Sequence, residues 1–147
     1  RRLEPKAPPP AKRLEALSRL VAEGVYAGVN AMPILPGITD STGALEDLVR
    51  SSALAGAKFL HGNTLFLMPS AMRTFMPFLA QDFPRLVRRY QRLYARSAYL
   101  PAEYKREIAD RLAELRLRYG LANSPPPARA ASGPMQLPLA FAPPGAA

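Results

Sequence analysis

The sequence predicts an α/β fold with parallel strands, followed by two amphipathic helices and a disordered tail. Helical and extended patterns alternate with short links at the start of the chain, an order that favours right-handed crossovers and a parallel sheet. Two stretches with apolar residues at helical spacing come next. The end of the chain is rich in Ala, Pro and Gly, a composition that buries too little apolar area to offset the entropy of ordering. We therefore expect three regions, residues 1–80, 81–121 and 122–147.

The composition excludes several classes of protein. The chain has 147 residues, enough for about one domain. It contains no cysteine and one histidine, which excludes a disulfide scaffold, a thiolate metal site, a cysteine nucleophile and a His-rich zinc site within this chain. No apolar run approaches the ~20 residues of a membrane span and no signal peptide opens the sequence, so we expect a cytoplasmic protein without a membrane partner. Because Arg1 and not Met opens the chain, we also expect an N-terminal part to be missing.

The first helix is expected over residues 11–23, where leucines recur at helical spacing and Gly24 ends the helix. Residues 25–32 follow as a strand that is apolar on both faces except at Asn30, a pattern typical of a strand buried on both sides of a parallel sheet. Two prolines in the loop of residues 33–40 prevent the ladder from continuing.

A second helix is expected over residues 42–55, with its N-cap among residues 40–42. A second strand over residues 58–67 and a helix over residues 70–80 complete the alternating part of the chain. Two strands cannot bury a parallel sheet on their own, so we expect at least two further strands beside them.

Ligand sites in parallel α/β folds lie beyond the carboxyl ends of the strands. The segments that reach this edge are residues 3–6, 30–40 and 64–69. We therefore expect any chemistry of the chain to lie in these segments.

The first amphipathic helix is expected over residues 82–97. The second is expected to have Pro101 in its first turn and to end at Gly120. Residues 81–120 carry ten bases against five acids. Arginines interleaved with tyrosines are typical of contact with a nucleic-acid backbone, so we interpret the arginine face of the first helix as a nucleic-acid contact, with a solvated charged face as the alternative. The arginines of this face are Arg85, Arg88, Arg89, Arg92 and Arg96.

Five short strings together resemble one known family. They are Leu-Glu-Pro at residues 3–5, Met-Pro-Ile-Leu-Pro-Gly-Ile-Thr-Asp at residues 32–40, Leu-Phe-Leu-Met-Pro at residues 65–69, Ser-Ala-Tyr-Leu at residues 97–100 and Arg-Tyr-Gly-Leu at residues 118–121. In this combination the chain is similar to the second half of radical S-adenosylmethionine proteins, in the branch of spore photoproduct lyase-related proteins that are often labelled DNA repair photolyases.

The resemblance implies a partial (β/α)6 TIM-like barrel, of which this chain is the C-terminal part. It also implies an enzyme in which a three-cysteine motif holds a [4Fe–4S] cluster and S-adenosylmethionine binds the open iron, so that reductive cleavage yields a 5′-deoxyadenosyl radical. The cysteine motif is absent here. We therefore expect the cluster to be bound by the missing N-terminal part, this chain to supply the adenosine side of the S-adenosylmethionine site, and this chain alone to be inactive.

The resemblance also assigns candidate cofactor contacts, each with a structural alternative. Glu4 would accept hydrogen bonds from ribose hydroxyls or the methionine ammonium, or would only precede the first helix. Asn30 would contact the cofactor, or satisfy a structural hydrogen-bond network. Apolar residues of the loop after the first strand would pack against adenine, or form a rigid turn. These loop residues are Met32, Pro33, Leu35 and Pro36.

Residues 136–141 in the tail resemble the motif that binds the bacterial sliding clamp. Gln136 would anchor one subsite, and Leu137, Leu139 and Phe141 would enter a hydrophobic pocket. The alternative is a set of apolar tail residues without a partner.

Two functions from different classes follow. The first is a radical S-adenosylmethionine enzyme that acts on DNA or another nucleic acid. The second is a non-catalytic module that binds DNA through its basic helices and the clamp through its tail. A sugar-phosphate barrel enzyme is disfavoured, because no Gly-rich phosphate loop follows a strand.

Overall fold

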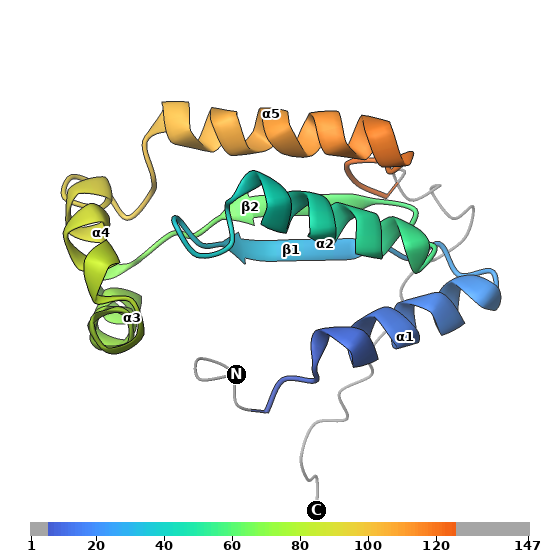
Figure 1. The fold of residues 1–147 in the computed structure, drawn as a ribbon, viewed down its shortest axis with the longest axis horizontal. Helices are drawn as coiled ribbons and strands as arrows, with labels where there is room; N and C mark the ends of the chain where they lie inside the picture. Colours follow the sequence, from blue (N-terminus) through green and yellow to red (C-terminus); the bar gives the residue numbers. More distant parts are fainter. Residues whose placement is uncertain (1–5, 126–147) are drawn as a thin grey trace, which may run out of the picture.

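A computed structural model describes residues 6–125 and has a mixed α/β fold (Figure 1). Within these residues a two-stranded parallel sheet packs with five α-helices, which confirms the predicted α/β class and the parallel pairing. None of these helices is long and apolar enough to cross a membrane. The elements are α1 (Pro10–Ala22), β1 (Val29–Ile34), α2 (Thr42–Leu54), β2 (Leu60–Thr64), α3 (Pro69–Asp82), α4 (Val87–Leu93) and α5 (Ala102–Tyr119).

Strand β1 begins later than expected and continues through a proline. It starts at Val29 instead of residue 25 and reaches Ile34, although Pro33 was expected to end the ladder. The register with β2 is irregular between Ala31 and Ile34. Pro33 has no N–H to donate, and an irregularity of this kind lets it remain in the strand without loss of a ladder hydrogen bond.

Only one face of the sheet is covered by the described residues. Side chains alternate between the two faces of a strand. Val29 and Leu60, which are paired in register, belong to the core beneath the helices, whereas the next pair, Asn30 and His61, points to the opposite face. Asn30 is exposed. The expectation that β1 is buried on both sides is therefore wrong for this part of the chain.

The first basic helix is shorter than its sequence pattern predicts. In place of one helix over residues 82–97, a 3-10 turn at Pro84–Leu86 leads into the seven-residue α4. After α4 the chain contacts the segment that follows β2. The Leu67 N–H of that segment donates to the Ala98 carbonyl at 2.7 Å. A turn and bends occupy residues 94–99, so the helix ends at Leu93 and does not reach residue 97.

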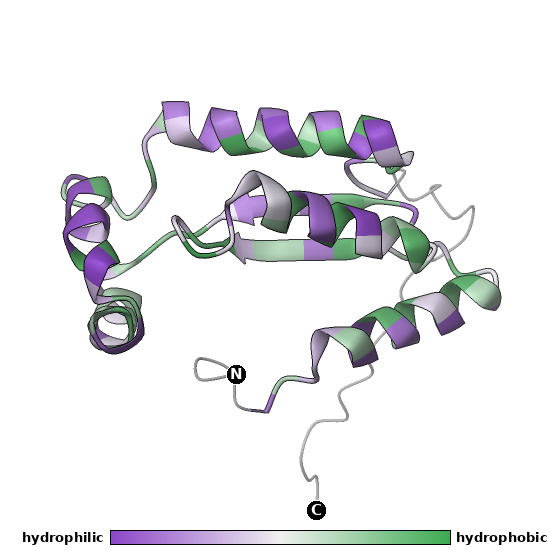
Figure 2. Cartoon of the chain, viewed as in Figure 1, coloured by the Kyte–Doolittle hydropathy of each residue, from purple (hydrophilic) through white to green (hydrophobic). Residues whose placement is uncertain are grey.

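Two core clusters of different chemistry hold the chain together. The first lies between the sheet, α2 and α5 and is aliphatic; its buried members include Ile34, Leu45, Val49, Leu60, Ile108 and Leu112. The second gathers α3, α4 and the segment leading to α5 and is rich in aromatic rings; its buried members are Leu67, Phe75, Leu79, Tyr90, Tyr94 and Leu100. Figure 2 shows hydrophobic and hydrophilic residues alternating along the helices, as expected where each helix buries one side.

The segment after α5 pairs with the start of the outer edge of β2. The Leu60 N–H donates to the Ala122 carbonyl at 2.9 Å, and the Ala122 N–H donates to the Lys58 carbonyl at 3.1 Å. Ala122 forms a parallel bridge with Phe59. The sequence pattern assigned residue 122 to the tail, whereas the structure places it beside the sheet. The remainder of the predicted tail, from residue 126, lies outside the described residues.

Candidate functional site

The open face of the sheet carries polar side chains at the centre of both strands. Asn30 of β1 and His61 of β2 are paired in register and share this face, and alternation places Asn63 on it as well. The Asn63 side-chain oxygen accepts a hydrogen bond of 2.9 Å from the Thr64 N–H. The amide of Asn30 and the imidazole of His61 are thus hydrogen-bonding groups that no described helix covers.

A groove of about 710 Å³ runs along the outer edge of β1, between α1 and α2. Three of the predicted cofactor contacts, Asn30, Met32 and Pro33, line it. The Val29 N–H donates to the Phe59 carbonyl of β2 at 2.9 Å. Because alternate residues of a strand direct their backbone groups to opposite edges, the N–H and C=O of Asn30 point into the groove.

The other predicted cofactor contacts of this loop lie elsewhere. Pro36 is fully buried, and Leu35 packs against the aromatic core cluster. The loop therefore splits into a groove-lining part at Met32 and Pro33 and a part that anchors it to α3 and α4. For Leu35 and Pro36 the geometry favours the rigid-turn interpretation that the sequence left open.

Local hydrogen bonds make this loop a compact turn. The Leu35 N–H donates to Thr39 Oγ1 at 2.8 Å, and the Thr39 N–H donates back to the Leu35 carbonyl at 3.0 Å. Gly37 adopts φ +73°, a left-handed conformation that suits glycine, and its N–H donates to Asp40 Oδ1 at 2.7 Å. The carboxyl end of β1 is therefore followed by a fixed surface.

Asp40 fastens the same loop to two distant helices and does not cap α2. Its Oδ2 accepts a hydrogen bond from the Tyr104 hydroxyl of α5 and lies 4.0 Å from Arg89 Nη2 of α4. Burial, together with the hydrogen bond to Asp40, raises the pKa of Tyr104 well above its usual range. The N-cap of α2 is Ser41, whose Oγ accepts from the Ala44 N–H at 3.2 Å. No sequence pattern indicates the Tyr104 contact, because 64 residues separate the partners.

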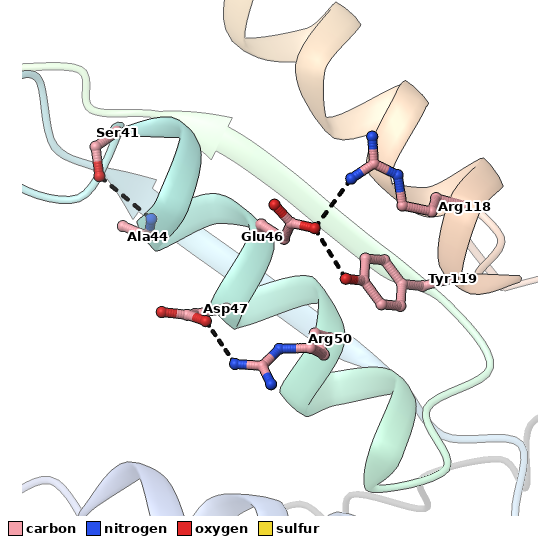
Figure 3. A network of polar contacts seen from close by, with 7 residues as sticks. All are labelled: Ser41, Ala44, Glu46, Asp47, Arg50, Arg118 and Tyr119. Atoms are coloured by element: carbon pink, nitrogen blue, oxygen red, sulfur yellow. Dashed lines mark hydrogen bonds and ion pairs between the residues drawn. The ribbon is translucent and has the colours of Figure 1, made fainter.

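A second polar network holds the end of α5 against α2 (Figure 3). Glu46 Oε1 accepts from Arg118 Nη1 and from the Tyr119 hydroxyl, each at 2.9 Å. The hydrogen bond to Glu46 raises the pKa of Tyr119. Within α2, the adjacent Asp47 pairs with Arg50, one turn further along the helix, at 2.7 Å. The two contacts of Glu46 hold α5 against α2, whereas the Asp47–Arg50 pair lies within α2.

The predicted arginine face is divided by the structure. Arg89 is half-buried against Asp40 and supports the loop. The other four are exposed and have no acidic partner among residues 6–125; they are Arg85, Arg88, Arg92 and Arg96. Two of them, Arg92 and Arg96, line a cleft shared with Tyr99 and Lys105. The sequence pattern did not single out Lys105, because it lies on another helix and outside the arginine run.

Some predicted site residues lie outside the described part of the chain. Glu4, Gln136, Leu137, Leu139 and Phe141 belong to this group, so the first cofactor contact and the clamp motif stay predictions. Within residues 6–125, no three His, Cys, Asp or Glu residues are grouped as metal ligands would be.

Comparison with known proteins finds relatives in mycobacteria. The chain is similar to the uncharacterized proteins Rv2578c of Mycobacterium tuberculosis and Mb2609c of Mycobacterium bovis, with 37% identity to each over 143 residues. The match covers 95% of this chain and 42% of each relative, so the chain spans about two fifths of the length of the curated relatives it matches. No family model and no solved structure matches the chain.

Proposed function

We propose that this chain forms the C-terminal part of a partial (β/α)6 barrel in a radical S-adenosylmethionine enzyme of the spore photoproduct lyase-related branch, and that the enzyme acts on nucleic acid. The observation that carries the proposal is the open half of the sheet. β1 has an unpaired outer edge within the described residues, and Asn30 and His61 lie on an uncovered face.

The groove beside β1 suits a further strand. Parallel strands are normally paired on both edges and covered on both faces. In a right-handed crossover, a strand that precedes α1 lies parallel to β1, on the side away from β2. That place is the groove between α1 and α2, where the backbone groups of Asn30 are free to pair. With further strands beyond it, the face of Asn30 and His61 becomes the interior of the barrel.

The residues near the carboxyl end of β1 suit the adenosine side of a cofactor site. Met32 is half exposed and Pro33 is exposed, so both can pack against a flat base and exclude water from it. The Asn30 amide can donate and accept hydrogen bonds. The turn that Asp40 fastens keeps this surface in place.

The iron–sulfur cluster does not fit this chain alone, since the chain has no cysteine. In the proposed enzyme another part of the protein holds the cluster, which supplies reductive cleavage of S-adenosylmethionine when bound. The contribution of this chain is to bind and orient the adenosine and to line the barrel.

The test is S-adenosylmethionine binding to the protein extended to the length of its mycobacterial relatives. We expect Asn30→Leu and Pro33→Ala to weaken binding by about tenfold, the loss of roughly one good contact, with little change in melting temperature. Asn123→Leu, the same substitution at an exposed position after α5, is the matched control. If the extended protein does not bind S-adenosylmethionine, the proposal is wrong. If it binds and neither variant weakens binding, this surface is not the adenosine side.

A further inference from the structure

A concave cationic surface lies between the end of α4 and the first turn of α5. It is a cleft of about 690 Å³ that the connecting segment of residues 94–101 helps to form. Arg92, Arg96 and Lys105 all line it, and no carboxylate does. Three cations that face one cleft without an acid to neutralise them attract an anionic ligand.

None of these cations is used elsewhere in the described part of the chain. Arg92 and Arg96 are exposed, and no ion pair among residues 6–125 involves either of them or Lys105. Arg89 shows the contrast, because its guanidinium faces Asp40 and stabilises the loop after β1. The charges of the cleft therefore have no acidic partner among the described residues, and an anionic ligand can pair with them.

The same cleft presents aromatic rings to solvent. Tyr99 lines it and is 58% exposed, and its ring stacks on Phe66, itself 55% exposed, with ring centroids 5.8 Å apart and planes inclined by 24°. Lys105 Nζ lies 5.8 Å from the centre of the Tyr99 ring. Exposed stacked rings beside free cations suit a ligand that combines a flat base with phosphate.

The position of the rings connects the cleft to the proposed active face. Phe66 follows β2 directly, beyond the carboxyl end of that strand, where ligands of parallel α/β folds bind. The hydrogen bond from the Leu67 N–H to the Ala98 carbonyl holds the two ring-bearing segments together. In Figure 1, α4 and the start of α5 lie at the end of the sheet towards which the β1 arrow points.

We propose that this cleft binds single-stranded nucleic acid, with phosphates at Arg92, Arg96 and Lys105 and an unpaired base against the Tyr99–Phe66 rings. Phosphate contact alone would suit duplex and single strand alike. The rings favour the single strand, because only an unpaired base can stack on a side chain. Arg85 and Arg88 continue the positive surface at helical spacing from Arg92 and extend the path for the backbone.

The inference rests on the proposed function for the reaction that a bound strand would undergo, but not for binding itself. It is therefore tested on this chain without S-adenosylmethionine, by fluorescence anisotropy of a labelled twelve-nucleotide oligothymidylate. A duplex of the same length is the comparison. We expect the single strand to bind more tightly than the duplex and its affinity to fall steeply with added salt.

Matched variants separate the phosphate contacts from the base contact. Arg96→Gln and Lys105→Gln should each weaken binding about tenfold at low salt and lower the salt slope by about 0.7, the value for one phosphate contact on a single strand. Arg106→Gln removes the same charge from the neighbouring position on α5, outside the cleft, and should have less than about a third of that effect. Tyr99→Ala should weaken the single strand about tenfold and leave the duplex unchanged, whereas Tyr99→Phe retains binding.

The inference is wrong if Arg106→Gln and the cleft variants lose the same affinity, or if Tyr99→Ala leaves single-strand binding unchanged. A duplex preferred over the single strand would have the same consequence. Tyr99 is exposed, so an unchanged melting temperature will confirm that its variants fold. If this chain binds the oligonucleotide but the extended protein does not bind S-adenosylmethionine, the cleft is supported and the proposed enzyme is rejected. If the extended protein binds S-adenosylmethionine but this chain does not bind the oligonucleotide, only the cleft is rejected.

Discussion

Along the outer edge of β2, Ala122 exchanges backbone hydrogen bonds with Lys58 and Leu60, and α5 lies across the adjoining face. Along the outer edge of β1, no strand of residues 6–125 pairs, and a groove takes the place of a neighbour. An unpaired strand edge is a template for pairing with another segment, and proteins normally cover it. The difference between the two edges means that the β1 edge is open along the described strand, whereas the β2 edge is already paired at its start.

The two edges also differ in how their surroundings are fixed. The helix α5, which packs on β2, is fastened by tertiary polar contacts in addition to apolar packing: Tyr104 contacts Asp40 of the loop after β1, and Arg118 pairs with Glu46 of α2. On the β1 side, the groove is lined by buried residues such as Ile34 at its base and by partly exposed ones such as Leu48 and Met32. The helix that packs on β2 is thus held by contacts between residues that lie far apart in the sequence.

The largest effect is expected where α5 packs on β2. Leu112 is 1% exposed, and an added Cβ at Gly62 of β2 would lie 2.5 Å from its Cδ1, so the two elements are in close contact there. Leu112→Ala should lower the free energy of unfolding by about 2–5 kcal/mol, because it leaves a cavity that the sheet cannot fill. Urea denaturation of the chain measures the change.

Leu117→Ala on the same helix is the control for this prediction. Leu117 is 86% exposed, so its truncation should change the free energy of unfolding by less than about 0.5 kcal/mol. Similar losses for the two leucines would contradict the view that α5 is packed against the sheet.

A smaller effect is expected from the hydroxyl that ties α5 to the loop after β1. Tyr104→Phe removes the donor to Asp40 and should cost about 1.5–3 kcal/mol of unfolding free energy at neutral pH, as for a hydrogen bond to a charged group. The measurement is a urea titration of both proteins, with Glu46→Gln as a comparison that weakens a more exposed network. A loss no greater than in Glu46→Gln would show that Asp40 does not depend on Tyr104.

The free energy of unfolding should also fall at alkaline pH, because three buried or half-buried tyrosines resist ionisation in the folded state. Burial raises the pKa values of Tyr90, Tyr94 and Tyr104, since it disfavours the phenolate in the folded state. The unfolded chain releases these protons near pH 10, so the stabilisation is complete below about pH 10 and is lost as the pH rises above it. Urea midpoints from pH 8 to 12 measure the decline, which should be shallower in Tyr94→Phe; equal slopes would contradict the assignment.

The smallest effect is a difference in hydrogen exchange rate between two backbone amides of β1. The N–H of Ala31 points to β2, whereas that of Asn30 points into the groove, so Asn30 should exchange its amide hydrogen at least about tenfold faster. Hydrogen exchange followed by NMR gives both rates in one sample. In the protein extended to the length of its relatives, the Asn30 amide should become protected; continued fast exchange would contradict a strand in the groove.

Local features of the sequence were sufficient for the order and type of the elements. Leucines at helical spacing predict α1, and Gly24 and Gly120 mark helix ends with φ +79° and +69°. The alternation of helix and strand predicts parallel pairing, which the structure contains. These features depend on residues within a few positions of one another, so they can be predicted from local sequence patterns.

Tertiary contacts decided the remaining features. Periodicity predicted one long basic helix, but α4 ends at Leu93, and the turn and bends after it bring the Ala98 carbonyl to the Leu67 N–H. The same periodicity grouped Arg89 with the other arginines of the basic face, whereas in the structure the Arg89 guanidinium faces Asp40. The cleft joins Arg96 to Lys105 across a bend between two helices. Each of these contacts forms between residues that the sequence separates, and only the packing of the helices on one face of the sheet brings them together.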